Sequence, residues 1–245
     1  MSTVTLSAIV LRYANYRDND RMLTLFSPQM GRVEVLSRGC RRPKSPFMSA
    51  SELFCTGEYL LYTQHDRHIL TGCTLHDSFY PLRLDINKLT LGVYLLNLCE
   101  AAVQPGDPNL ELFKLLIRSL NQLAYGEPQE KLLLATFLYQ YAALLGYKPR
   151  LDQCVHCGRQ LRQEENAYLN CEEGGLVCKN CFVVNQKNFP LSGRQVDWLR
   201  KLADNGSDSL SISSEDAPLN GLRAYVECRL DRPIKCGAML HPDSD

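Results

Sequence analysis

The sequence predicts an α+β protein in which a small five-stranded barrel precedes an all-α helical domain with a cysteine-rich insert. Residues 1–80 contain five short segments rich in Val, Leu, Ile, Thr and aromatic residues, as strands do. Residues 81–245 instead carry apolar residues at helical spacing. Two Cys-x-x-Cys pairs then mark an insert at about residues 150–185. We therefore expect two domains, at residues 1–80 and 81–245.

Turn residues separate the five predicted strands. Ser27 to Gly31 interrupts the second and third strands, and the polar Gln64 to Arg67 interrupts the fourth and fifth. Five short strands with one longer connection, at Ser37 to Ser51, are the number expected of an OB-fold barrel. An SH3-like barrel fits this number almost as well. The strands are predicted at Thr5–Tyr13, Arg21–Phe26, Arg32–Leu36, Leu53–Tyr62 and His68–Thr74.

Helix-ending residues divide the second half of the chain. Pro105-Gly106 ends the first helix, Gly146 is placed as the cap of the third, and Pro233 ends the last. Ser192 is placed as the N-cap of the fourth helix. The first three helices are apolar over broad faces, so we expect them to bundle together. The helices are predicted at Asp85–Val103, from Pro108 beyond Leu120, from Pro128 to Leu145, at Ser192–Ala203 and at Gly221–Arg232.

Length and charge set broad limits on function. A chain of 245 residues can form one or two domains with a sizeable core. Lys plus Arg and Asp plus Glu number 27 each, so the net charge indicates neither a nucleic-acid nor a membrane partner. The longest apolar run, Leu132 to Tyr147, contains Gln140 and is too short to span a bilayer. It is interpreted as a buried helix, and no membrane partner is expected.

The two cysteine pairs predict one zinc ion. Cys154 and Cys157 form the first pair, and Cys178 and Cys181 form the second, with twenty residues between the pairs. Each pair can bring two sulfurs to one ion, and together they complete a thiolate tetrahedron with zinc–sulfur distances of ~2.3 Å. Four thiolates leave no open position for water or substrate, so the zinc is expected to be structural.

Two other uses of cysteine fit this sequence less well. A redox Cys-x-x-Cys is expected once, on a thioredoxin-like βαβ unit. Disulfides are disfavoured because the chain has 11 cysteines, an odd number, and starts without the features of an export signal. Cys171 and His156, which also lie in the insert, are interpreted as bystanders. Gly174 and Gly175 predict a tight turn, and hence a short hairpin, before the second pair.

A basic loop follows the third predicted strand. Between Arg32 and Lys44, Glu34 is the only acidic residue, and Phe47 and Phe54 flank the loop. Such a loop on a small barrel can follow phosphates and stack bases. The alternative is a solvated loop that only aids solubility. The predicted DNA-binding residues are Arg32, Arg38, Arg41, Arg42 and Lys44, extended by Arg12, Arg17 and Arg21, although Asp18 and Asp20 weigh against that extension.

No catalytic machinery is apparent in the sequence. It contains no Gly-x-x-x-x-Gly-Lys phosphate loop, no Gly-x-Gly-x-x-Gly, no His-Glu-x-x-His and no Gly-x-Ser-x-Gly. His68 and His76 are interpreted as ordinary surface histidines. We therefore predict a protein that is not an enzyme and has no catalytic residues.

Eight short segments, spread in order over nearly the whole chain, match one family. They are Ala8–Arg12, Asp20–Phe26, Gly31–Val33, Arg38–Arg42, Gly146–Pro149, Cys154–Gly158, Gly174–Cys178 and Arg232–Lys235. Together they resemble the RecO recombination mediators of bacterial DNA repair. The chain departs from the family pattern at Asp20, where Glu is frequent, and at Cys236, where Ser is common.

The resemblance implies an OB-fold, a helical domain and a zinc-binding insert, in agreement with the residue patterns. It implies a cytoplasmic, nucleoid-associated protein that binds single- and double-stranded DNA and anneals complementary strands. The implied partners are RecR and the carboxy-terminal tail of single-stranded-DNA-binding protein, with a functional link to RecA. It also makes the basic loop a DNA contact. A zinc-stabilised protein-interaction scaffold without direct DNA binding, and a zinc-dependent nucleic-acid enzyme, are the alternatives.

Overall fold

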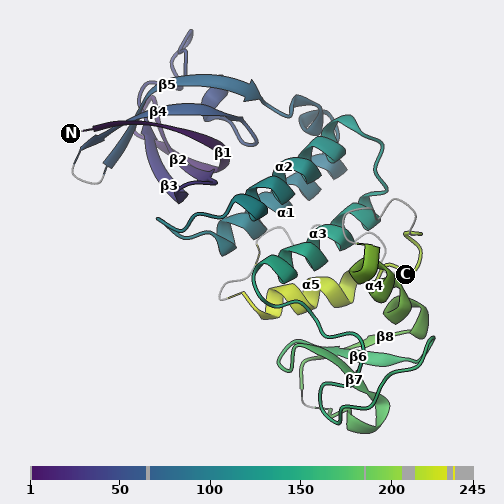
Figure 1. The fold of residues 1–245 in the computed structure, drawn as a ribbon. Coiled ribbons are helices and arrows are strands. Elements are labelled where there is room, and N and C mark those ends of the chain that lie inside the picture. The colour runs from purple at the N-terminus through teal and green to yellow at the C-terminus, as the bar shows by residue number, and fades with distance from the viewer. Residues whose placement is uncertain (1, 65–66, 185, 206–212, 231–233, 235–245) are drawn as a thin grey trace. The chain divides into compact units, whose positions relative to one another are not determined.

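The computed structural model describes residues 2–64, 67–184, 186–205, 213–230 and 234 (Figure 1). Packing contacts divide these residues into a first unit that extends to Gly126 and a second unit that starts at Glu127. Because the first unit extends to Gly126, it contains the barrel and the first two predicted helices. The predicted domain boundary between residues 80 and 81 remains a prediction. Among the described residues, no helix is long and apolar enough to cross a membrane.

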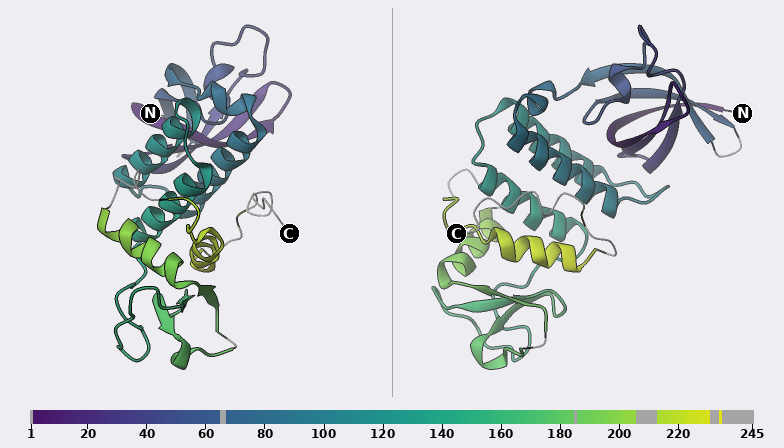
Figure 2. Two further views of the ribbon diagram at one scale, coloured as in Figure 1. Left: turned by 90° about the vertical axis from the view of Figure 1, so that its right-hand side faces the viewer. Right: turned by 180° about the vertical axis from the view of Figure 1, so that it is seen from behind.

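Five strands form a closed barrel in the first unit (Figures 1 and 2). The long first strand pairs with β4 through its first half and with β2 through its second half, which closes the barrel. The order is β1-β2-β3-β5-β4, with β3 and β5 parallel. This topology is that of an OB-fold rather than of the SH3-like alternative. The strands are β1 (Ser2–Tyr16), β2 (Asp20–Ser27), β3 (Gly31–Ser37), β4 (Thr56–Gln64) and β5 (Arg67–Asp77).

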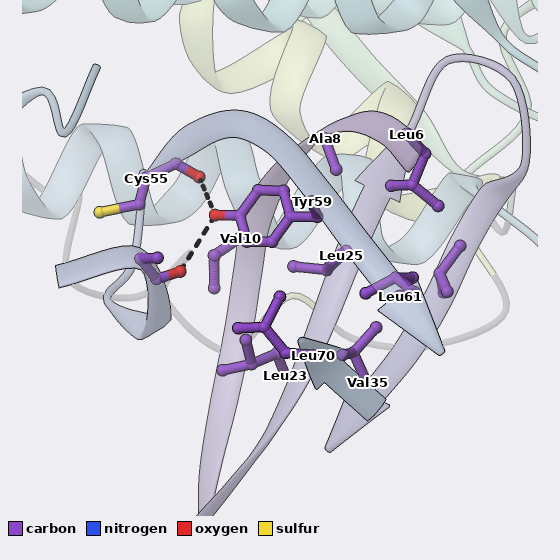
Figure 3. Packing of buried hydrophobic residues seen from close by; sticks show 12 residues of the cluster. Leu6, Ala8, Val10, Leu23, Leu25, Val35, Cys55, Tyr59, Leu61 and Leu70 are labelled. Carbon is purple, nitrogen blue, oxygen red and sulfur yellow. Dashed lines mark hydrogen bonds between the residues drawn. The ribbon is translucent and has the colours of Figure 1, made fainter. Parts of the chain in front are cut away.

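Alternating apolar residues fill the barrel interior (Figure 3). Side chains two residues apart on a strand point to the same face, so each strand contributes every second residue. Tyr59 is fully buried among them and donates its hydroxyl to the carbonyl oxygens of Ala50, at 3.0 Å, and Cys55, at 3.2 Å. The core includes Leu6, Ala8, Val10, Leu23, Leu25, Val35, Leu61 and Leu70.

Two helices pack with the barrel in the first unit. They are α1 (Ile86–Ala102) and α2 (Leu110–Tyr125), and they pack against each other. The side chain of Asp85 caps the N-terminus of α1. The side chain of Asn109 caps that of α2, so this helix starts just after the predicted start near Pro108. Gly31 lies at φ +65°, where a Cβ would collide with the carbonyl oxygen of Gln104. The β2–β3 turn therefore lies directly against the loop that follows α1. A short 3₁₀ helix, Tyr80–Leu84, leads into α1.

The second unit combines three helices with a three-stranded sheet of order β7-β6-β8. The predicted hairpin is confirmed, because β6 and β7 are antiparallel and Gly174 turns between them at φ +77°. Helix α3 belongs to the second unit and packs on α5, whereas α1 and α2 belong to the first unit. Neither unit therefore contains the predicted bundle of three consecutive helices. Arg232 and Pro233, the predicted end of the last helix, lie outside the described residues. The elements are α3 (Glu130–Leu144), β6 (Ala167–Asn170), β7 (Gly175–Cys178), β8 (Asn188–Leu191), α4 (Gly193–Asn205) and α5 (Leu219–Cys228).

Candidate nucleic-acid interface and metal centre

The four predicted metal ligands come together in the second unit. The sulfurs of Cys154, Cys157, Cys178 and Cys181 all lie within 4.8 Å of one another, and those of Cys157 and Cys178 are 4.0 Å apart. A tetrahedral zinc–thiolate site with bonds of ~2.3 Å requires sulfur–sulfur distances of about 3.8 Å. The cluster can therefore hold one metal ion with little movement of its ligands.

Backbone geometry prepares the first pair for an ion. Gly158 lies at φ +74° and donates its N–H to the carbonyl oxygen of Cys154, at 2.9 Å, which closes the turn. The N–H of Cys178 points at the sulfur of Cys154, at 3.4 Å. Cys154 and Cys178 are buried, whereas Cys157 is exposed. The cluster therefore lies at the surface of the second unit, with two of its sulfur-bearing residues buried and one exposed.

The thiols of this cluster have strongly perturbed pKa values. Burial raises the pKa of Cys178, but hydrogen bonds from Cys181 and Asn180 outweigh burial and lower that pKa to about 6. The thiol of Cys181 donates hydrogen bonds to Cys178 and Cys157, and these bonds favour the protonated form and raise the pKa of Cys181 to about 12. Four adjacent thiolates repel one another, so they cannot all ionise without a cation between them. A bound divalent cation would remove that repulsion and hold all four as thiolates.

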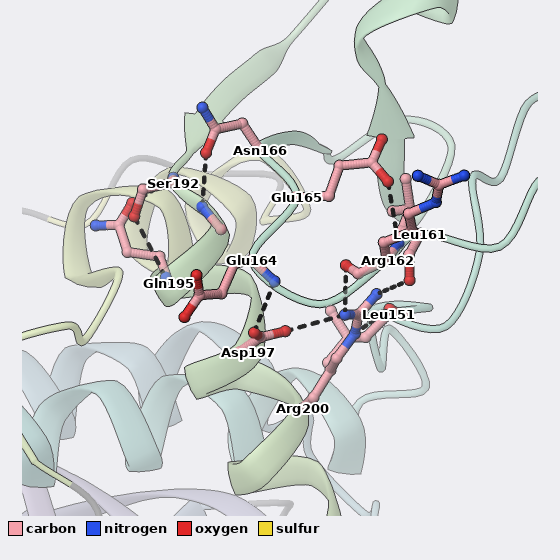
Figure 4. Close-up of polar contacts among 11 residues, drawn as sticks. Leu151, Leu161, Arg162, Glu164, Glu165, Asn166, Ser192, Gln195, Asp197 and Arg200 are labelled. Carbon is pink, nitrogen blue, oxygen red and sulfur yellow. Dashed lines mark hydrogen bonds and ion pairs between the residues drawn. The ribbon is translucent and has the colours of Figure 1, made fainter.

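Arg200 of α4 fixes the loop that carries the first pair (Figure 4). Its guanidinium donates to the carbonyl oxygens of Leu151 and Leu161, each at 3.0 Å, and of Arg162, at 3.2 Å. Asp197 pairs with Arg200 at 3.0 Å and also accepts the N–H of Glu164, at 2.9 Å. One planar guanidinium thus makes three hydrogen bonds to the backbone of this irregular loop and a fourth to Asp197.

Neither other candidate in the insert joins the metal cluster, but Cys171 is not a bystander. His156 is exposed and lies 3.6 Å from the carboxylate of Glu173. Cys171 forms a disulfide with Cys228 of α5. The expectation that disulfides are disfavoured in this chain is therefore wrong for these two cysteines. Their 57-residue separation leaves no spacing pattern by which the sequence could show the pair.

The basic loop of the barrel is bonded to a second loop. The carboxylate of Asp20 accepts the N–H of Gly39 at 2.7 Å, and the N–H of Arg41 donates to the carbonyl oxygen of Asn19 at 3.0 Å. The guanidinium of Arg41 also donates to the carbonyl oxygen of Asp18, at 3.2 Å. These bonds place the β1–β2 turn beside the loop after β3. The exposed cations of the two loops are Arg17, Arg38, Arg41, Arg42 and Lys44.

The other three predicted cations have contacts within the first unit. Arg12 pairs with Glu100 at 2.9 Å. Arg21 pairs with Glu52 at 2.7 Å and stacks on Tyr13, 4.0 Å from its ring centroid. Arg32 is half-buried in β3. Their role in DNA binding stays a prediction.

The aromatic residues near the loop differ from those expected. Phe54 is fully buried, so the expectation that it can stack on a base is wrong. Phe47 packs partly against the barrel core. Tyr16 is 41% exposed at the end of β1, and the guanidinium of Arg17 lies 5.1 Å from its ring centroid. The sequence did not indicate Tyr16, because it lies at the end of β1, far along the chain from the basic loop.

Two family descriptions match the chain in succession. "Recombination protein O N terminal" matches residues 1–79, and "Recombination protein O C terminal" matches residues 83–236. The chain belongs to the RecO family. The joined basic loops lie in the amino-terminal RecO match, and the four-cysteine cluster lies in the carboxy-terminal one. These matches confirm the resemblance found in the sequence. RecO family members are DNA repair and recombination proteins.

Curated RecO relatives cover almost all of the chain. The DNA repair protein RecO of Desulfitobacterium hafniense strain Y51 is 32% identical over 242 residues, covering 95% of this chain and 87% of the relative. That of Moorella thermoacetica is 30% identical over 238 residues, covering 95% and 88%. That of Desulforamulus reducens is 28% identical over 240 residues, covering 96% and 93%.

Proposed function

We propose that this protein is a recombination mediator that acts by binding, without making or breaking covalent bonds. It binds single- and double-stranded DNA, anneals complementary strands, and helps to load RecA onto DNA coated with single-stranded-DNA-binding protein. It would work in the bacterial cytoplasm, at the nucleoid. Membership of the RecO family supports this role.

The joined basic loops carry the DNA-binding part of the proposal. Five exposed cations belong to two loops that hydrogen bonds hold together, and the acidic Asp20 is occupied in holding them. Each Lys or Arg that neutralises a phosphate releases a counterion, so DNA is favoured although the net charge of the chain is zero. Tyr16 offers a partly exposed ring for a base.

Annealing follows from the same charges. Two DNA strands repel each other through their phosphates before their bases pair. A surface that neutralises phosphates on both strands lowers this repulsion and brings the strands together. No activated nucleophile or general base is required for that step.

We propose one structural zinc ion at Cys154, Cys157, Cys178 and Cys181. The sulfur–sulfur distances fit a thiolate tetrahedron, and a closed four-thiolate site leaves no position for substrate. The zinc would join the loop of the first pair to the end of β7. Its role is to hold the fold of the second unit.

We propose RecR and the acidic tail of single-stranded-DNA-binding protein as protein partners, with the tail in a pocket between α3 and α5. The pocket is a small recess, with a cavity volume of about 10 Å³. The Nε atom of Arg229 is buried there without a hydrogen-bond partner among the described residues. Apolar walls beside a partly exposed arginine suit a peptide end that is both acidic and apolar. The lining includes Tyr141, Leu145, Tyr147, Tyr225, Arg229 and Leu230.

Salt-dependent binding of a labelled single-stranded oligonucleotide tests the DNA interface. Changing Arg38, Arg41, Arg42 and Lys44 together to Ala should weaken binding and reduce the slope of log affinity against log salt by about 2–3, because each single-strand phosphate contact contributes roughly 0.7. The matched control changes four exposed cations elsewhere, Lys114, Arg118, Arg194 and Lys201. Equal slopes for the loop variant and the wild type would contradict the interface.

That contradictory result would favour the zinc-stabilised scaffold without DNA binding. Strand annealing on DNA coated with single-stranded-DNA-binding protein separates the two roles further. A mediator should accelerate annealing on coated DNA, and the loop variant should lose that acceleration. A scaffold would leave the annealing rate unchanged in both cases.

Binding of a labelled acidic peptide with an apolar carboxy-terminal residue tests the tail pocket. Arg229→Ala should reduce its affinity roughly tenfold, as expected when a charged hydrogen bond is lost. Arg194→Ala, an exposed arginine on α4, is the control and should have no effect. Equal affinities for both variants would place the tail elsewhere.

A further inference from the structure

A disulfide joins two elements of the second unit that are distant in sequence. Cys171 directly follows β6, at the start of its turn into β7, and Cys228 is the last residue of α5. Cys171 is fully buried, whereas Cys228 is partly exposed. The bond therefore ties the end of a helix to the hairpin that carries Cys178, a member of the metal cluster.

Several weaker contacts surround this bond. Arg229 donates to the carbonyl oxygen of Glu172 at 3.2 Å, and its guanidinium lies 5.1 Å from the ring centroid of Tyr147. The hydroxyl of Tyr225 donates to the carbonyl oxygen of Tyr147 at 2.9 Å. Leu222, Tyr225 and Val226 are also buried, and α5 packs on α3. Packing therefore holds the helix, and the disulfide fixes its last residue, Cys228, to the turn that follows β6.

The end of α5 also forms one wall of the pocket between α3 and α5. Tyr225, Val226, Arg229 and Leu230 line it, and Cys228 lies within this segment. Whatever fixes Cys228 also fixes that wall. Opening the disulfide would free the partly exposed end of this wall, at Arg229 and Leu230, while the buried Tyr225 and Val226 stay packed.

We propose that Cys171 and Cys228 form a reversible redox latch that exchanges with low-molecular-weight thiols and disulfides. In the oxidising direction, the Cys228 thiolate attacks a sulfur of a small disulfide, forming a mixed disulfide and expelling one small thiolate. The Cys171 thiolate then attacks the Cys228 sulfur and expels the second small thiolate. The two protons of the cysteines pass to the two thiols released, and each step breaks one sulfur–sulfur bond as it forms another.

The order of these steps follows from exposure. An incoming thiolate needs access to the sulfur that it attacks, and Cys228 is the more accessible partner. Reduction therefore begins at Cys228 and releases the buried Cys171. The mixed disulfide should accumulate on Cys228 rather than on Cys171. The latch does not rest on the proposed DNA or tail binding, although it fixes one wall of the pocket proposed for the tail.

Thiol mapping of the full-length, zinc-loaded protein tests the latch. The folded protein is equilibrated with oxidised or reduced glutathione, quenched with acid, alkylated in denaturant so that the buried Cys171 can react, and digested for mass spectrometry. A linked Cys171–Cys228 peptide is expected in oxidised glutathione, and two alkylated cysteines are expected in reduced glutathione. Oxidation should raise the melting temperature by about 5–10 °C and slow hydrogen exchange over residues 222–230.

Variants separate the latch from other cysteine chemistry. Cys228→Ser and Cys171→Ser should each abolish the redox-dependent shift in melting temperature. Cys73→Ser, which removes a partly exposed cysteine of the barrel, should retain it. The latch is overturned if the linked peptide is absent in oxidised glutathione. It is also overturned if the bond resists reduced glutathione until the protein is denatured, because the disulfide is then a fixed cross-link.

Discussion

The barrel and the cysteine-rich second unit are stabilised by different interactions. The barrel closes five strands around a continuous apolar core, with Leu23, Leu25 and Tyr59 fully buried. The sheet of the second unit has only three strands of four residues each, and its buried Leu169 and Leu176 belong to a core shared with helices. Strong local links add to this packing: the four-cysteine cluster, the disulfide and Arg200.

Because of this difference, we expect the two units to respond differently to mutation and to chemical conditions. A barrel with a continuous core can carry loops of high charge, because its stability does not depend on them. A unit that carries a candidate metal cluster and a disulfide should respond to its chemical surroundings, because metal and thiol chemistry can open these links. We expect changes in the barrel to act through packing and changes in the second unit to act through single links.

Metal removal should produce the largest difference between the two units. Stripping zinc with a strong chelator should unfold the sheet of the second unit, because zinc binding contributes roughly 10 kcal/mol or more to small zinc-thiolate folds. Hydrogen exchange followed by mass spectrometry should then show loss of protection in β6 and β7 but not in β2 and β3. Adding zinc back should restore the protection. Equal losses in both units would contradict the independence of the barrel.

A cavity in the barrel core should give the next largest effect. Leu25→Ala removes a fully buried side chain and should lower the free energy of unfolding of the barrel by about 2–5 kcal/mol. Leu60→Ala on β4 is the control, because Leu60 is 37% exposed and should lose little. Urea unfolding followed by tyrosine fluorescence measures both. Similar losses for the two variants would argue against a core-dominated barrel.

Arg200→Ala should produce an intermediate effect in the second unit. It leaves three carbonyl oxygens and the Asp197 carboxylate without their donor, so we expect a loss of about 2–3 kcal/mol. Arg200→Lys keeps the charge but cannot donate to all of these groups, and it should restore only part of the loss. Arg194→Ala should be neutral. Full rescue by Lys would show that charge, rather than the donor geometry, is what matters.

Local patterns in the sequence predicted the barrel and the metal ligands. Strand alternation and turn residues act over a few neighbours, and a Cys-x-x-Cys pair fixes two ligands within one turn. The basic run from Arg38 to Lys44 was visible for the same reason. These features were predictable because the residues that define each of them are adjacent in the chain.

Features set by tertiary packing were not predictable in this way. The Cys171–Cys228 bond and the Arg200 contacts join segments 38–57 residues apart. Phe54 was placed beside the basic loop, but its backbone enters a left-handed turn and its ring is buried. The pairing of α3 with α5 escaped detection because a helix apolar over a broad face does not reveal its partner.

The smallest effect should come from a surface ion pair in the same second unit. Hydrogen bonds from Arg159 and from the N–H of Arg162 lower the pKa of Glu165 to about 2, below its usual value near 4.5. The folded protein therefore holds the carboxylate more strongly than the unfolded chain does. This stabilisation is fully present above about pH 4.5 and is lost as the pH falls towards 2.

Glu165→Gln should accordingly lower the urea midpoint slightly at pH 7, and the difference from wild type should shrink at pH 4. Comparing both proteins at each pH removes the acid sensitivity that they share through the metal cluster. The effect should be small because water screens this exposed pair. A loss as large as that of Arg200→Ala would show that the second unit depends on surface charge as well as on its buried links. A difference that grew at low pH would contradict the lowered pKa of Glu165.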